Sequence, residues 1–174
     1  MIQNGMYYMT DSYKELMHSL GGEWNDRKKR PIVCLLQSTE NPDLYWAIPV
    51  GKVNHRDENV LNKINIYMNY SDIRSCYYHI GRTTNKSIFF IFDVIPITDK
   101  YILEEHLGSD EQHYILKNHN LISALETKLK RILSWENANP NSFRQHITDV
   151  KNYLIDELNS ENEKLTQTNK EQET

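Results

Sequence analysis

The stretch of sequence that decides the fold reads RKKRPIVCLLQ at residues 27–37 and continues as YWAIPVGKVNHR at residues 45–56. Each segment contains a short apolar run that is rich in β-forming residues, and the Asn-Pro-Asp at residues 41–43 is typical of a turn. We therefore expect two neighbouring strands that resemble a hairpin with a rather long loop. Pro49 cannot donate a hydrogen bond to a sheet, so we expect a bulge or a strand end there.

Basic residues lie at one end of each apolar run. Residues 27–30 are four consecutive cations before the first run, and Lys52, His55 and Arg56 follow the second. If the runs are neighbouring strands, these charged ends can converge on one anionic ligand. The alternative is that the cations are a solvated loop and that His55 is an ordinary surface residue.

The charge of the chain is unevenly distributed. The formal net charge is −4, but residues 23–90 contain ten Lys/Arg against seven Asp/Glu, whereas residues 93–111 contain six acids and one lysine. A locally positive face on an acidic protein fits a specific anion site better than a diffuse one. A separate hypothesis is that the acidic segment, residues 93–111, is a docking site for a protein partner.

Length and composition indicate one globular domain. The chain has 174 residues, of which 39% are hydrophobic. We expect a single domain over residues 1–158, and a disordered tail over residues 159–174 because that segment has almost no apolar content. No apolar run approaches the ~20 residues of a membrane span, and the N-terminus does not resemble a signal peptide. Two cysteines inside apolar runs fit small buried residues in a reducing cytoplasm, so we expect a cytoplasmic protein.

The remaining pattern predicts an α+β domain whose sheet is mostly antiparallel. We expect a helix over residues 11–20, and strands over residues 64–70, 75–80 and 87–95, the last closed by Pro96. Two helices follow, one starting at Asn118 or Asn120 and one starting at Asn139-Pro140. Helices from both ends of the chain should therefore cover the sheet.

The basic cluster matches the requirements for cutting RNA without a metal ion. A base must take the proton of the ribose 2′-OH, cations must stabilise the charge on the phosphorane, and an acid must protonate the 5′-leaving oxygen. Histidine with lysine or arginine supplies all three and yields a 2′,3′-cyclic phosphate and a 5′-hydroxyl. A metal nuclease fits poorly because the acids lie apart from the cations, and we expect neither a metal nor another cofactor. The other histidines, including His106, show no informative spacing.

Several blocks of the sequence, taken in order, resemble a known family. They are residues 30–37, 45–56 and 78–96 and the helix over residues 117–133. These blocks look like the toxin of type III toxin–antitoxin systems, the ToxN/AbiQ-like group, and most of all its CptIN branch. The resemblance covers residues 1–158. It implies a metal-independent endoribonuclease that acts in phage defence, with a strongly bent antiparallel sheet or barrel similar to that of MazF/Kid toxins. It also implies inhibition by a pseudoknot RNA antitoxin, whose precursor the toxin processes and with which it forms a closed heteromeric complex.

The resemblance assigns roles to individual residues. Lys52, His55 and Arg30 fall at positions that imply catalysis, with Lys52 as the leading candidate. The candidates for holding RNA are Arg27, Lys28, Lys29, Arg56, Arg82, Thr83, Thr84, Lys86 and Ser87. ToxN-like members carry Thr-Ser where this chain has Val50-Gly51, so a hydroxyl role does not transfer; Thr83, Thr84, Ser87 or Ser38 could supply it. The alternative function is a non-catalytic protein that binds a structured RNA in the same groove.

Overall fold

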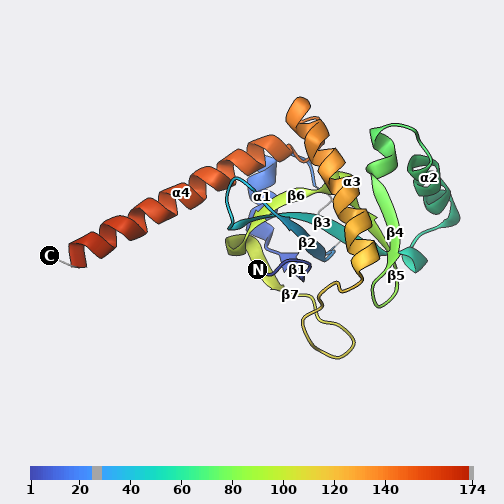
Figure 1. Cartoon of the computed structure of the whole chain (residues 1–174), viewed down its shortest axis with the longest axis horizontal. Helices are drawn as coiled ribbons and strands as arrows, with labels where there is room; N and C mark the ends of the chain where they lie inside the picture. Colours follow the sequence, from blue (N-terminus) through green and yellow to red (C-terminus); the bar gives the residue numbers. More distant parts are fainter. Residues whose placement is uncertain (25–28, 173–174) are drawn as a thin grey trace.

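The structure is a computed structural model that describes residues 1–24 and 29–172. Within these residues, seven strands form an open antiparallel sheet in the order β4-β5-β3-β2-β1-β7, with β6 paired to β3 beside β5 (Figure 1). The strands are β1 (Met6–Met9), β2 (Ile32–Gln37), β3 (Leu44–Lys52), β4 (Tyr78–Arg82), β5 (Lys86–Phe90), β6 (Ile95–Thr98) and β7 (Ile102–Glu105). The α-helices are α1 (Asp11–Ser19), α2 (Glu58–Met68), α3 (His119–Ala138) and α4 (Ile147–Gln172). The α+β class is confirmed, but the sheet is not closed into a barrel.

Helices cover both faces of the sheet, as the sequence predicts. Alternate residues of β2 belong to two different hydrophobic clusters. Val33 and Leu35 pack with the buried face of α3, whereas Ile32 and Cys34 pack with side chains of α1 and α4. All four are fully buried, which explains why β2 is a continuous apolar run rather than an alternating one.

Strand β3 changes its partner at Pro49. On one edge β3 pairs with β2 throughout, and the register places Ile32 opposite Pro49. On its other edge residues 44–47 pair with β6 and residues 50–52 pair with β5. The Val50 N–H donates to Pro31 O at 2.9 Å, so the nitrogen of Pro49 faces the opposite edge, at the gap between β6 and β5. The hairpin is confirmed, but the predicted bulge or strand end at Pro49 is wrong, because β3 continues to Lys52.

The predicted strand over residues 87–95 is two strands. β5 ends at Phe90, the 3₁₀ helix η3 (Ile91–Asp93) follows, and Pro96 lies inside β6 rather than closing a strand. The turn lets one segment pair with both halves of the same edge of β3. A continuous strand could not do this, and the apolar run alone does not reveal the turn.

Residues 64–70 belong mainly to helix α2, so the predicted strand is wrong there. The Asp57 side chain caps the helix by accepting from the Val60 N–H at 2.9 Å. Ile64 is buried, and Leu61 and Met68 pack around it, which is helical spacing. Ile64, Ile66 and Met68 alternate in the sequence, which favours a strand. In the helix they do not share one face, and Ile66 is 58% exposed to solvent.

The last helix begins later than the sequence predicts. Asn139 is the C-cap of α3 rather than the start of a new helix, and α4 begins at Ile147. A buried carboxylate, Glu136, organises the loop between the two helices. Its Oε1 accepts from Asn141 N (2.6 Å) and from both N (3.2 Å) and Oγ1 (2.6 Å) of Thr148. A side chain of the preceding helix, Glu136, therefore accepts the hydrogen bonds of Thr148 at the start of α4. Local sequence patterns do not reveal this contact.

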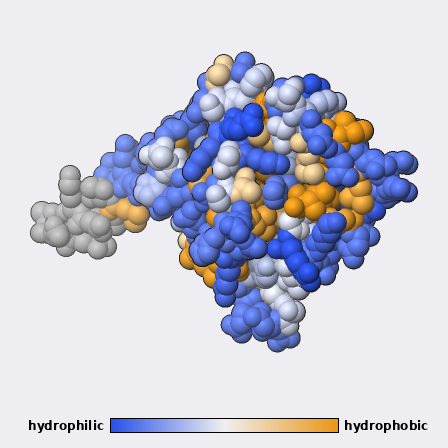
Figure 2. All heavy atoms as spheres, turned by 45° about the vertical axis from the view of Figure 1, so that its right-hand side comes forward, coloured by the Kyte–Doolittle hydropathy of each residue, from blue (hydrophilic) through white to orange (hydrophobic). Residues whose placement is uncertain are grey.

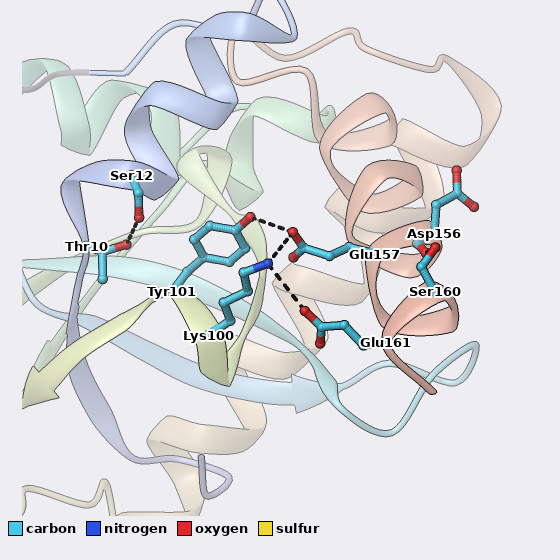
Figure 3. Close-up of polar contacts among 8 residues, drawn as sticks. All are labelled: Thr10, Ser12, Lys100, Tyr101, Asp156, Glu157, Ser160 and Glu161. Atoms are coloured by element: carbon cyan, nitrogen blue, oxygen red, sulfur yellow. Dashed lines mark hydrogen bonds and ion pairs between the residues drawn. The ribbon is translucent and has the colours of Figure 1, made fainter. Parts of the chain in front are cut away.

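Helix α4 runs past the predicted end of the domain. In Figure 1 it extends away from the body of the protein and continues to Gln172, where the sequence predicts a disordered tail. Residues 160–172 contain neither Gly nor Pro to end a helix. Lys100 anchors the middle of α4 by contacting Glu157 Oε1 (2.5 Å) and Glu161 Oε1 (3.3 Å), and the Tyr101 hydroxyl also donates to Glu157 (Figure 3). The domain boundary at residue 158 stays a prediction.

The face of the protein drawn in Figure 2 is mainly hydrophilic, with apolar residues in separate patches. Large exposed apolar side chains include Ile66, Leu103 and Trp135, which come from three different elements. Single exposed residues of this kind are normal and mark no site by themselves. In the part of the chain that the structure describes, no helix combines the length and the apolar character needed to cross a membrane.

The Glu136 network gives a testable prediction about stability. Glu136 is 2% exposed, so Glu136→Ala leaves several buried donors of the α3–α4 loop unsatisfied. We expect the free energy of unfolding in urea to fall by about 2–4 kcal/mol. Glu126→Ala, on the same helix and paired only with Lys130 at 3.7 Å, is the matched control and should change it by about 0.5 kcal/mol or less. Equal effects of the two substitutions would contradict this account of the loop.

Candidate functional site

The basic strand ends border a cleft with a volume of about 660 Å³. Its walls are the start of β2, the end of β3 with the 3₁₀ helix η1 (Val53–His55), the turn between β4 and β5, and residues 106–109. Eight of the predicted site residues line it: Lys29, Arg30, Lys52, His55, Arg56, Thr83, Thr84 and Ser87. The described residues that line the cleft include four Lys/Arg and two His, and no Asp or Glu. This surface favours an anion.

The lining of the cleft does not include two other predicted residues that the structure describes. Arg82 lines an adjoining cavity of about 320 Å³, which shares Thr84 with the cleft. Lys86 is exposed on the same hairpin, opposite Arg82, and is not among the residues that line the cleft. Arg27 and Lys28 lie outside the described residues. The structure therefore brings together the central part of the predicted site.

Strand pairing explains why residues distant in sequence meet here. In the antiparallel pair β2–β3, the first residues of β2 lie beside the last residues of β3, as the pairing of Ile32 with Pro49 shows. On the other edge of β3, Lys52 lies opposite Ser87 of β5. The expected convergence of the two basic strand ends is therefore confirmed for the described residues.

Two arginines lie against one aromatic ring in the cleft. The guanidinium carbons of Arg30 and Arg56 lie 4.8 Å and 5.4 Å from the centre of the Phe90 ring. Burial and the neighbouring Arg56 lower the pKa of Arg30. Arg56 Nε is buried and has no hydrogen-bond partner among the described residues. An anion beside the two guanidinium groups would relieve their repulsion.

The sequence analysis missed an ion pair between the buried Asp93 and the exposed Arg144. Arg144 donates to Asp93 Oδ1 from Nη2 at 2.8 Å and from Nε at 3.2 Å. Burial raises the pKa of Asp93, while the attraction of Arg144 and Arg30 opposes that rise. Asp93 therefore offsets part of the positive charge without lining the cleft. Its partner comes from the loop before α4, far along the chain, so no local signal identifies the pair.

Gly51 explains the absence of a hydroxyl before Lys52. A Cβ atom at Gly51 would lie 3.1 Å from Cε2 of Phe90 and 3.2 Å from Nη2 of Arg56. The space that a side chain would need is thus occupied by the arginine and the ring. Arg56 takes the place of a side chain at position 51.

The four candidate hydroxyls differ in position. Thr83 Oγ1 and Ser87 Oγ lie 2.9 Å apart, and Ser87 also donates to Asn85 O at 3.0 Å, so this pair stabilises the β4–β5 turn. Thr84 is exposed and lines the cleft. Ser38 follows the opposite end of β2 and is not among the residues that line the cleft. Thr84 is therefore the hydroxyl most available to a ligand.

His106 and Tyr8 also line the cleft, although the sequence analysis gave neither a role in it. His106 Nδ1 lies 3.1 Å from the Tyr8 hydroxyl, and the rings meet edge to face with centroids 5.5 Å apart. Burial lowers the pKa of His106, and the charges of Lys52 and His113 lower it further. The pairing of β1 with β7 brings these residues together, so their spacing in the sequence could not reveal them.

Within residues 1–24 and 29–172, no three His, Cys, Asp or Glu side chains gather in a way that could hold a metal ion.

Comparisons with known proteins found likenesses only among solved structures. No protein-family model and no curated protein matches the chain. Among solved structures, one match is AbiQ, described as "a lactococcal anti-phage endoribonuclease belonging to the type-III toxin-antitoxin system". The match covers 77% of this chain and 81% of that chain, with 16% sequence identity and a TM-score of 0.49. AbiQ belongs to the group that the sequence resembles, and the match does not test the CptIN branch.

The close approach of Arg56 to Gly51 can be tested with a double-mutant cycle. We expect Gly51→Ala to lower the free energy of unfolding by about 1–3 kcal/mol, because the added methyl group overpacks Phe90 and Arg56. In an Arg56→Ala background the same substitution should cost less, with a coupling of at least ~0.5 kcal/mol measured by urea unfolding of the four proteins. Strictly additive effects would show that Arg56 does not occupy this space.

Proposed function

We propose that this protein is an endoribonuclease that cleaves single-stranded RNA without a metal ion and serves as the toxin of a type III toxin–antitoxin system. The observation that carries the proposal is the cleft in which Arg30, Lys52, His55 and Arg56 converge with no acid among its described lining residues. A cleft of about 660 Å³ is in the size range of ligand sites and can take part of an RNA strand.

The proposed chemistry uses the side chains at the end of β3 and the start of β2. The ribose 2′-OH attacks the adjacent phosphorus, and Lys52 and Arg30 stabilise the negative charge of the phosphorane. His55 acts as a general base or acid. The products are a 2′,3′-cyclic phosphate and a 5′-hydroxyl.

The remaining cations would hold the RNA backbone. Lys29 and Arg56 line the cleft itself, and Arg82 lines the adjoining cavity, so a strand that leaves the reaction centre past Thr84 would reach Arg82. Arg27, Lys28 and Lys86 are further candidates, although no described wall of the cleft includes them. Phosphate contacts of this kind position the strand and carry no base information.

The proposed partner is a structured RNA antitoxin of the pseudoknot type, which blocks the cleft and forms a heteromeric assembly with the toxin. Under this proposal the toxin also processes the precursor of that RNA and acts in the cytoplasm during phage defence. The cationic lining of the cleft supports an RNA partner, because the same groups that bind a substrate phosphate can bind an inhibitory one.

Cleavage in the presence of EDTA tests the catalytic proposal. We expect the purified protein to fragment single-stranded RNA with EDTA present, and Lys52→Ala to lower the single-turnover rate by ~10²–10⁴-fold. Lys63→Ala, an exposed lysine on α2 outside the cleft, is the matched control and should retain the rate.

Each other outcome has a distinct meaning. Intact RNA that is bound tightly would favour the non-catalytic RNA-binding alternative. Cleavage that appears only after Mg²⁺ is added would reject the proposed mechanism. A folded Lys52→Ala protein with full activity would remove Lys52 from the reaction centre.

The salt dependence of binding tests the role of Lys29. With single-stranded RNA made uncleavable by 2′-O-methylation, Lys29→Ala should reduce the slope of log affinity against log salt by ~0.7 in magnitude, because one phosphate contact is lost. The same lysine lies 3.7 Å from Glu104, an exposed pair that RNA can replace. Lys63→Ala should leave the slope unchanged, and an unchanged slope in Lys29→Ala would exclude a phosphate contact.

A further inference from the structure

A histidine and a tyrosine that line the cleft form a dyad that the proposed mechanism does not yet use. His106 follows β7, Tyr8 belongs to β1, and both line the cleft together with Lys52 and His55. The backbone also fixes this wall, because the His106 N–H donates to Met6 O at 2.9 Å and Tyr114 N donates to His106 O at 2.8 Å. The backbone of His106 is thus held at both its N–H and its carbonyl oxygen.

One nitrogen of the ring is engaged and the other is left for a ligand. His106 Nδ1 lies 3.1 Å from the Tyr8 hydroxyl. When Nδ1–H donates to the tyrosine oxygen, Nε2 carries the lone pair and is the nitrogen that can accept a proton. Catalytic bases are commonly held in this way, with a third group that fixes the tautomer and the orientation of the ring.

The charged surroundings of the dyad favour the neutral imidazole. Burial lowers the pKa of His106, and Lys52 and His113 lower it further. The other titratable groups around the dyad belong to several elements: Lys29 before β2, Glu104 and Glu105 on β7, and Tyr114 beyond it. The two acids have cationic or imidazole neighbours of their own, since Glu104 lies 3.7 Å from Lys29 and Glu105 lies 3.4 Å from His113.

We propose that His106 is the general base of the cleavage reaction, that Tyr8 is the residue that positions it, and that His55 is the general acid. This assignment rests on the proposed function. It places a base and an acid on two walls of one cleft, with Lys52 also at the site.

The proposed step balances without a further reactant. His106 Nε2 takes the proton of the 2′-OH as the bond between O2′ and phosphorus forms. The bond between phosphorus and O5′ breaks, and the imidazolium of His55 gives its proton to the departing O5′. His106 ends protonated and His55 ends neutral, and exchange with water restores both.

The test is the pH dependence of the single-turnover cleavage rate in EDTA. The wild-type rate should rise with pH as His106 loses its proton, with a midpoint below the ordinary histidine value of ~6.5, because the base must be neutral to act. His106→Ala should lower the plateau by ~10²–10⁴-fold and abolish this rise, and added imidazole should restore part of the rate. His55→Ala should lower the rate by a similar factor and keep the rise with pH.

Tyr8→Phe separates positioning from packing. This variant keeps the ring that lies against His106 and beneath Lys29 Nζ, and removes only the hydroxyl. We expect a fall in rate of about tenfold or less, as for one lost hydrogen bond, together with a shifted midpoint of the acid limb. His119→Ala, an exposed histidine at the start of α3, is the matched control and should keep both the rate and the midpoint.

The assignment is overturned if folded His106→Ala, with unchanged affinity for 2′-O-methylated RNA, retains the wild-type rate and pH profile. It is also overturned if imidazole fails to restore activity or if the rise with pH disappears in His55→Ala instead. Failure of the wild-type protein to cleave RNA would reject the proposed function itself, so the two failures are distinguishable.

Discussion

The antiparallel pairing of β2 with β3, and the change of partner that β3 makes at Pro49, determine the rest of the structure. Because β2 starts where β3 ends, Arg30 lies near Lys52. Because Pro49 has no N–H to donate, β3 can pass from β6 to β5 there without leaving a donor unpaired. The second partner then brings the β4–β5 turn to the same end of β3. β3 thus lies at the centre of the sheet and, through its pairing with β2 and β5, positions three of the four walls of the cleft.

Repulsion among the cations is the cost of this arrangement, and the surroundings reduce it in two ways. The Phe90 ring lies beneath Arg30 and Arg56, and the buried Asp93 lies close enough to Arg30 to oppose the effect of its neighbours. Burial raises the pKa of Asp93, and the attraction and hydrogen bonds of Arg144 oppose that rise. Gly51 leaves the space in which Arg56 lies. The arrangement therefore favours an anionic ligand, whose charge would offset the repulsion among the cations.

The sequence predicted the parts of the fold that depend on local pattern. The β2–β3 hairpin, the convergence of the basic strand ends, α1 and the Asn118 cap of α3 are confirmed. It failed where a distant partner decides the outcome. Glu136 sets the start of α4. Residues 87–95 form two strands because β5 and β6 pair with different halves of one edge of β3. Packing of Ile64 against Phe90 makes residues 64–68 helical. The sequence did not predict His106 as a site residue for the same reason, since the pairing of β1 with β7 brings it beside Tyr8.

The central claim is that the cleft uses the RNA's own 2′-OH as the nucleophile, and the product ends test it most directly. Mass spectrometry of the fragments formed from a defined single-stranded RNA identifies the group on each new 3′ end. The account predicts a 2′,3′-cyclic phosphate paired with a 5′-hydroxyl, and no cleavage where the ribose before the scissile phosphate is 2′-deoxy. Fragments that carry a 3′-hydroxyl and a 5′-phosphate, or equal cleavage of the 2′-deoxy strand, would contradict it.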